Sequence, residues 1–160
     1  WVAYVPYAAR YPFEIHVTPL NPVADLTELT DLDRDAFPEI ALEVTRRLDG
    51  VFGIEMAYIA AWHQAPVRVG RDLLRLHWQI TSVRRALGKL KYLAGSESAM
   101  GAFIMDMRPE QSAAQLRCRE KRSARSGGGG DVSERSAGAV RQPGHMPCRV
   151  SAVAGLRDRG

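Results

Sequence analysis

Four histidines are the residues of this 160-residue sequence best suited to acid–base, nucleophilic or metal chemistry: His16, His63, His77 and His145. They form no Ser-His-Asp arrangement, and the sequence has no phosphate-binding loop and no dinucleotide fingerprint. His63 and His77 lie near the ends of two predicted neighbouring strands, where an antiparallel pairing would bring their rings together. Neutral imidazoles suit zinc or iron, but a metal ion would need at least one further ligand. The alternative is that both are ordinary histidines satisfied in or near the core.

A second group of candidate residues surrounds a predicted turn. Arg84, Arg85, Lys89 and Lys91 lead into Gly95-Ser96-Glu97-Ser98. This combination suggests a place for a phosphate beside a carboxylate that could bind hydroxyl groups. The alternative is a solvated, charged turn without a ligand.

The charge is unevenly distributed along the chain. Residues 1–110 contain 12 Lys and Arg against 14 Asp and Glu, whereas residues 111–160 contain 10 against 4. The net charge of +4 therefore comes from the C-terminal part, and we do not expect a nucleic-acid groove in the part that can fold. With 46% hydrophobic residues, the chain is not wholly disordered. Cys118 and Cys148 fit neither a disulfide framework nor a zinc spacing.

No segment of the sequence is suited to crossing a membrane. The longest run without Asp, Glu, Lys or Arg is Met56 to Val67, twelve residues that include His63 and Gln64. This run is too short and too polar for a bilayer. The first residues also lack a secretory signal, so we expect a cytoplasmic protein with no membrane partner.

Hydrophobic periodicity predicts strands over residues 1–6, 13–18, 58–63 and 73–83, and a short strand over 89–95. A capping box at Thr30 and Asp33 predicts a helix that ends at Gly50. Pro38 falls inside this helix, which predicts a kink or a start near that residue. A last helix is expected from Pro109 to about Lys121.

The C-terminal stretch has a composition that cannot build a core. Residues 123–160 contain eight glycines and six arginines but no lysine or aromatic residue. We therefore expect a domain over residues 1–122 followed by a disordered Gly/Arg-rich tail over residues 123–160. The alternative is an arginine-rich arm that binds nucleic acid.

Several separated blocks resemble one known family in order and spacing. They are Val5 to Glu14, Trp62 to Pro66, Lys91 to Glu97 and Pro109 to Gln111. Together they resemble the C-terminal half of galactose-1-phosphate uridylyltransferases, over roughly residues 1–119. The resemblance implies an α+β fold of the histidine-triad-like type, an antiparallel sheet with packed helices.

The resemblance also implies an activity, the transfer of UMP from UDP-glucose to galactose 1-phosphate through a uridylyl-histidine intermediate. The nucleophile of the family belongs to a His-Pro-His motif in the first half, and these 160 residues contain no such motif. The chain also begins at Trp1 rather than Met. We therefore expect an inactive, substrate-binding fragment of an enzyme whose intact form is a homodimer. The alternative is a non-catalytic nucleotide-binding module that pairs with a separate half.

The resemblance assigns roles to particular positions. Lys91, Tyr92, Ser96 and Glu97 match positions that bind the UDP-hexose, although the family has an aromatic residue where Ser96 stands. Phe103 falls where the family has a glutamine.

For the metal, the resemblance makes His63 and His77 two of the four ligands of a structural zinc or iron site. Gln79 takes the place of the third ligand, a histidine, and the fourth is a glutamate of the first half. Two ligands of four should not hold a metal tightly.

Overall fold

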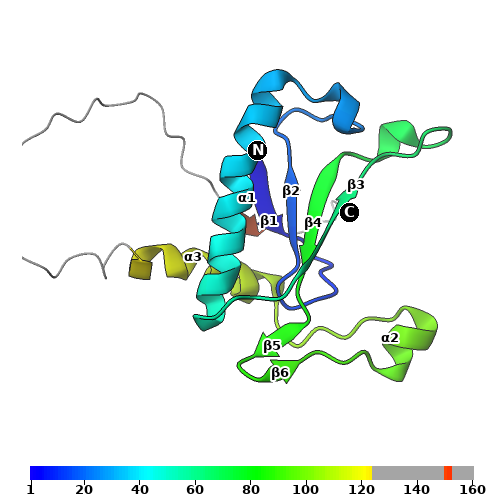
Figure 1. Ribbon diagram of the computed structural model, residues 1–160. Coiled ribbons are helices and arrows are strands. Elements are labelled where there is room, and N and C mark those ends of the chain that lie inside the picture. The colour runs from blue at the N-terminus through cyan, green and yellow to red at the C-terminus, as the bar shows by residue number, and fades with distance from the viewer. Residues whose placement is uncertain (124–149, 153–160) are drawn as a thin grey trace, which may run out of the picture.

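The computed structural model describes residues 1–123 and 150–152, and its centre is a five-stranded sheet (Figure 1). The strand order across this sheet is β3-β4-β2-β1-β7. The strands are β1 (Val2–Val5), β2 (Ile15–Thr18), β3 (Ile59–His63), β4 (His77–Thr81) and β7 (Val150–Ala152). β1 and β2, β2 and β4, and β3 and β4 pair antiparallel, whereas β7 runs parallel to β1.

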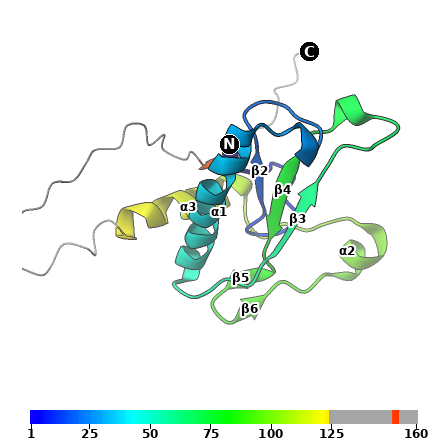
Figure 2. The same ribbon diagram turned by 45° about the horizontal axis from the view of Figure 1, so that its top comes forward.

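Two helices complete the domain. α1 (Asp31–Phe52) lies along one face of the sheet, and α3 (Pro109–Ser123) packs beside it (Figures 1 and 2). The core contains fully buried side chains from α1, α3 and the sheet. They include Val5, Phe13, Ile15, Val17, Val44, Leu48, Ile80 and Leu116. This arrangement confirms the predicted α+β fold with an antiparallel sheet and packed helices.

The alternation of side chains along each strand gives the sheet two different faces. Ile15, Val17 and Ile80 are buried in the core below α1. His16 and Gln79, which alternate with them and pair across β2 and β4, lie on the other face. We call this second face the outer face, and it also carries His63 and His77.

The ends of α1 show where the sequence was informative and where it was not. Thr30 and Asp33 form the predicted capping box, and the helix then continues through Pro38. Of the two alternatives offered for Pro38, a start near that residue was therefore wrong. The predicted end at Gly50 was also wrong, because the helix reaches Phe52 and Gly53 caps it with a left-handed φ of 69°.

A projecting arm connects the sheet to α3 (Figures 1 and 2). We define the arm as residues 84–107. It contains the hairpin β5 (Arg84–Ala86) and β6 (Lys89–Leu90), followed by α2 (Gly95–Met100). The predicted strand over 89–95 was therefore wrong beyond Leu90, because residues 91–94 are irregular and α2 begins at Gly95. The 3-10 helices η1 (Leu26–Glu28) and η2 (Arg71–Leu73) lie in other connections. The predicted strand 73–83 is a strand only over His77–Thr81.

Most of the predicted tail, residues 124–149 and 153–160, lies outside the described residues. Within the predicted tail, Val150–Ala152 form β7 beside β1. None of the helices in the described part of the chain has the length and apolar character needed to span a membrane.

Candidate functional site

Lys91 and Glu97 form a buried ion pair at the base of the arm. The Lys91 Nζ lies 2.8 Å from Oε1 of Glu97, and each side chain is only 3% exposed. Lys91 follows β6, and Glu97 lies in the first turn of α2. The Glu97 carboxylate reaches back to accept the backbone N–H of Ala94 (2.7 Å), which orients the start of this short helix. The structure therefore brings together two residues that were predicted to act together.

Internal partners engage both charged groups of this pair. The Lys91 ammonium has three N–H groups, and besides Glu97 it donates to the carbonyls of Arg10 (3.1 Å) and Ile104 (2.6 Å). Oε1 of Glu97 also accepts the N–H of Ile104 at 3.0 Å. The hydrogen bond from Lys91, followed by those from the two backbone N–H groups, lowers the pKa of Glu97 to about 2. The pair thus joins the arm to the loop between β1 and β2.

The other two predicted contacts occupy different environments. Tyr92 is 83% exposed, and Ser96 is partly buried. No hydrogen bond within the described residues joins Tyr92 to Lys91 or Glu97. The segment 92–96 is therefore fixed at its two ends by the buried pair, while Tyr92 remains open to solvent.

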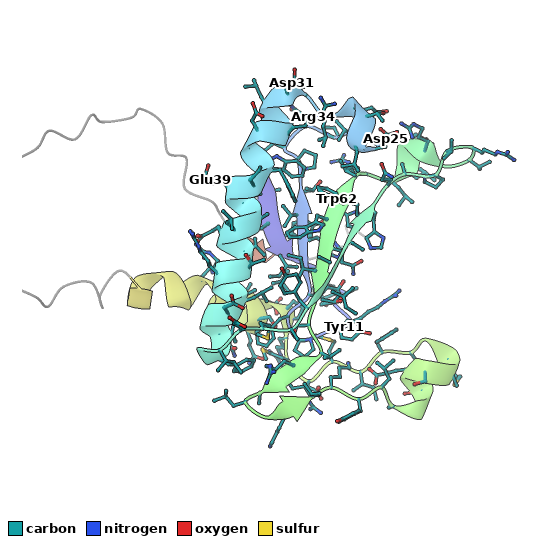
Figure 3. All side chains as sticks on the ribbon, in the orientation of Figure 1. Tyr11, Asp25, Asp31, Arg34, Glu39 and Trp62 are labelled. Carbon is teal, nitrogen blue, oxygen red and sulfur yellow. The ribbon has the colours of Figure 1, made fainter. Side chains whose placement is uncertain are left out.

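Aromatic and cationic side chains surround Lys91. Its Nζ lies 5.9 Å from the ring centroid of Tyr11 and 6.0 Å from that of Phe103. The Arg10 guanidinium lies 5.1 Å from the Phe103 centroid. Tyr11 is labelled in Figure 3, at the end of the sheet that faces the arm. The sequence predicted Arg10 and Tyr11 only as part of a connection between two strands. The one feature that could have indicated a role at this site is a cationic residue next to an aromatic residue, just before Pro12.

The other basic residues around the turn do not gather at this pair. Arg85 forms an ion pair with Asp106 at 2.7 Å, and Lys89 is exposed. Both line an open depression of about 340 Å³ together with Pro12, Ala86, Asp106 and Met107. None of the four predicted substrate contacts lines this depression.

His63 and His77 face each other across β3 and β4, as predicted. Their ring centroids are 5.0 Å apart, and the rings are tilted by only 7°. Nδ1 of His77 lies 3.0 Å from the carbonyl oxygen of Arg75, so Nδ1 carries the proton and Nε2 keeps its lone pair. Burial lowers the pKa of His77, which favours the neutral ring. This is the protonation state that a metal ligand requires.

A third imidazole, for which no role was predicted, lies beside this pair. The His16 ring stacks on His77 with centroids 4.8 Å apart. Its Nε2 is 3.1 Å from Oε1 of Glu14. The Glu14 carboxylate also accepts from Gln79 Nε2 at 2.7 Å, so the residue at the third ligand position is already engaged.

The residues present do not complete a metal site. Within residues 1–123 and 150–152, no group of three or more His, Cys, Asp and Glu side chains is placed to hold a metal ion. His63 and His77 therefore supply two adjacent imidazoles and no further ligand.

Comparisons with solved structures and with family models place this α+β fold among the uridylyltransferases. The structure of a uridylyltransferase mutant superposes with a TM-score of 0.69 and 36% identity. The superposed region covers 76% of this chain and 40% of the uridylyltransferase chain. The model of the galactose-1-phosphate uridyl transferase C-terminal domain matches residues 1–126, and the chain belongs to this family.

Curated relatives give the same result. The galactose-1-phosphate uridylyltransferase of Thermotoga maritima is 32% identical over 119 residues, which is 73% of this chain and 37% of the relative. That of Streptomyces lividans is 35% identical over 133 residues, 73% of this chain and 36% of the relative. The chain thus spans about a third of the length of the curated relatives it matches.

Proposed function

We propose that this chain is the substrate-binding portion of a UDP-glucose:hexose-1-phosphate uridylyltransferase of galactose metabolism. Its family membership over residues 1–126 supports this proposal. The main structural support for the proposal is the buried Lys91–Glu97 pair, which fixes both ends of the segment that contains Tyr92 and Ser96. Those are the four positions at which the family resemblance implies contacts to a UDP-hexose.

The carboxylate of Glu97 has the chemistry that sugar hydroxyls require. Its pKa of about 2 keeps it ionised at neutral pH, and an ionised carboxylate acts only as an acceptor. Oε1 already accepts from Lys91 and from Ile104 N–H, whereas Oε2 accepts from Ala94 N–H. We therefore assign hydroxyl binding to Oε2, which retains acceptor capacity. Lys91 would then act mainly by holding Glu97 in place, with Tyr92 covering the ligand from the solvent side.

The same proposal predicts that these residues alone do not turn over substrate. A uridylyl-histidine requires an imidazole that attacks the α-phosphorus, and the 160 residues contain no His-Pro-His. The nucleophile must come from polypeptide outside this sequence, in an assembly that we propose to be a homodimer when intact. UDP-glucose and galactose 1-phosphate are the proposed substrates of that assembly.

Two measurements on the purified chain test this function. Calorimetric titration with UDP-glucose should give weak binding, with a Kd of about 1 mM, and Glu97→Gln should weaken it further. An exchange assay between UDP-glucose and galactose 1-phosphate should show no product. Sustained exchange by the chain alone would contradict the proposed division of the site, and the lack of any UDP-glucose binding would contradict the binding role.

A further inference from the structure

A hydrogen-bond network on the outer face of the sheet is centred on Glu14, a residue that the proposed function does not use. Glu14 directly precedes β2, and its side chain is only 4% exposed. Its Oε1 lies 2.7 Å from Nε2 of Gln79 and 3.1 Å from Nε2 of His16. Its Oε2 accepts the backbone N–H of Arg10 at 2.7 Å. Three donors thus converge on one buried carboxylate: Arg10 and His16 are close to Glu14 in the sequence, whereas Gln79 comes from β4.

These donors explain how a carboxylate is tolerated at this depth. Burial by itself disfavours the charged form, but the hydrogen bonds from His16, Arg10 and Gln79 outweigh it and lower the pKa of Glu14. Because the ionised carboxylate only accepts, Gln79 and His16 must both donate to it. The Gln79 amide nitrogen is therefore directed toward Glu14.

The hydrogen bond from Gln79 to Glu14 matters for the neighbouring imidazoles, because Gln79 lies beside them. Gln79 and His77 are two residues apart on β4 and so share the outer face, where His77 pairs with His63. His77 is held in the tautomer that leaves Nε2 available, by its bond to the Arg75 carbonyl. The proton on Nδ1 of His77 therefore leaves Nε2 free to bind a metal ion. The third imidazole, His16, stacks on His77 and bonds to Glu14, and the described residues contain no group of three His, Cys, Asp or Glu side chains placed to hold a metal ion.

We propose that the Glu14 network, and not a zinc or iron ion, fixes the outer face of this sheet, so that the chain folds without a metal. A closed structural metal site ties several strands together through four ligands. The Glu14 carboxylate joins two strands in a comparable way, because it directly precedes β2 and accepts a hydrogen bond from Gln79 on β4, while its bonds to Arg10 and His16 fix its own position. This inference concerns stability and does not depend on the proposed substrates.

The first test uses the unaltered 160-residue chain. Elemental analysis after purification should find far less than one zinc or iron per chain. The Tm should change by no more than about 1 °C when EDTA is added. One metal ion per chain, together with a marked fall in Tm on chelation, would overturn the proposal without requiring any variant.

The second test removes the donor from the network. Gln79→Leu leaves the buried Glu14 carboxylate short of one partner, so the Tm should fall by about 5 °C. The fall should be the same with and without EDTA. An unchanged Tm would show that the network does not stabilise this face, which contradicts the proposal.

The third test asks whether the outer face fails to bind a metal ion because Gln79 stands where a histidine ligand would be needed. Gln79→His places an imidazole at the position of the third ligand and should tighten Co²⁺ binding by about 10- to 100-fold, measured by visible absorption. Thr81→His is the matched control, because it places an imidazole on the same strand and face but farther from His77. Co²⁺ binding by the unaltered chain as tight as that of Gln79→His would overturn the proposal.

Discussion

The ammonium of Lys91 and the carboxylate of Glu97 lie 2.8 Å apart at the base of the arm, and their side chains are almost completely buried. Lys91 also donates to the carbonyls of Arg10 and Ile104, and Glu97 also accepts the N–H groups of Ala94 and Ile104. A pair arranged in this way has a structural role before it meets any ligand, because it joins the arm to the loop that contains Arg10 and orients the start of α2.

Removal of one partner should therefore destabilise the domain strongly. Lys91→Met leaves the Glu97 charge buried and without its cation, so the Tm should fall by about 10 °C. The double variant Lys91→Met/Glu97→Gln removes both charges and should recover part of the loss. Thermal unfolding of the single and double variants measures this coupling, and strictly additive effects would mean that the two side chains do not act as a pair.

The low pKa of Glu97 predicts how stability depends on pH. The folded-state pKa is about 2, below the ordinary value of 4.5, so the folded state favours the ionised form. The contribution of Glu97 is then complete above about pH 4.5 and is lost as the pH falls toward 2. Urea unfolding of the unaltered chain and of Glu97→Gln should differ at pH 6 and converge toward pH 2. A difference that stays constant with pH would contradict the assignment.

The exposed ring of Tyr92 should contribute to binding and little to folding. Tyr92→Ala should leave the Tm unchanged within about 1 °C and weaken UDP-glucose binding by about tenfold. Val67→Ala is a suitable control, because Val67 is also exposed but lies in the connection between β3 and β4, at the opposite end of these strands from Thr81, after which the arm begins. Equal effects of the two substitutions on binding would argue against a contact at Tyr92.

The C-terminal cap of α1 gives a prediction independent of function. Gly53 has φ of 69°, and a Cβ added at this position would have no atom within 4 Å, so only the backbone conformation opposes a side chain. Gly53→Ala should cost about 1 kcal/mol of unfolding free energy, and Gly53→Asn about half as much, since asparagine tolerates this conformation better. Equal stability of all three proteins in urea unfolding would contradict the left-handed cap.

The sequence was most informative where a local pattern determines a local structure. The Thr30–Asp33 capping box, the strands of the antiparallel sheet and the facing of His63 and His77 follow from spacing alone. The continuation of α1 through Pro38 was not predictable in this way. Pro38 lies on an exposed side of a long helix whose buried positions, such as Val44 and Leu48, pack into the core. That packing outweighs the local cost of the proline.

The candidate site was predictable only in part, for a similar reason. The order of the motifs predicted that Lys91 and Glu97 belong to one site. It did not predict that they are buried, because their burial depends on the backbone carbonyls of Arg10 and Ile104. The position of Glu14 between Gln79 and His16 likewise depends on strand register over long sequence separations. Such tertiary contacts leave no trace in local periodicity.

Amide chemical shifts, followed during a titration with UDP-glucose, report whether the segment from Tyr92 to Glu97 binds a UDP-hexose. We predict saturable shift changes concentrated in residues 91–97 and in Ile104, whose N–H contacts Glu97. Glu97→Gln should reduce those changes under conditions in which the dispersion of its amide signals shows that the variant is folded. Saturable shifts located elsewhere, or none at millimolar UDP-glucose, would show that this segment is not the binding site for UDP-glucose.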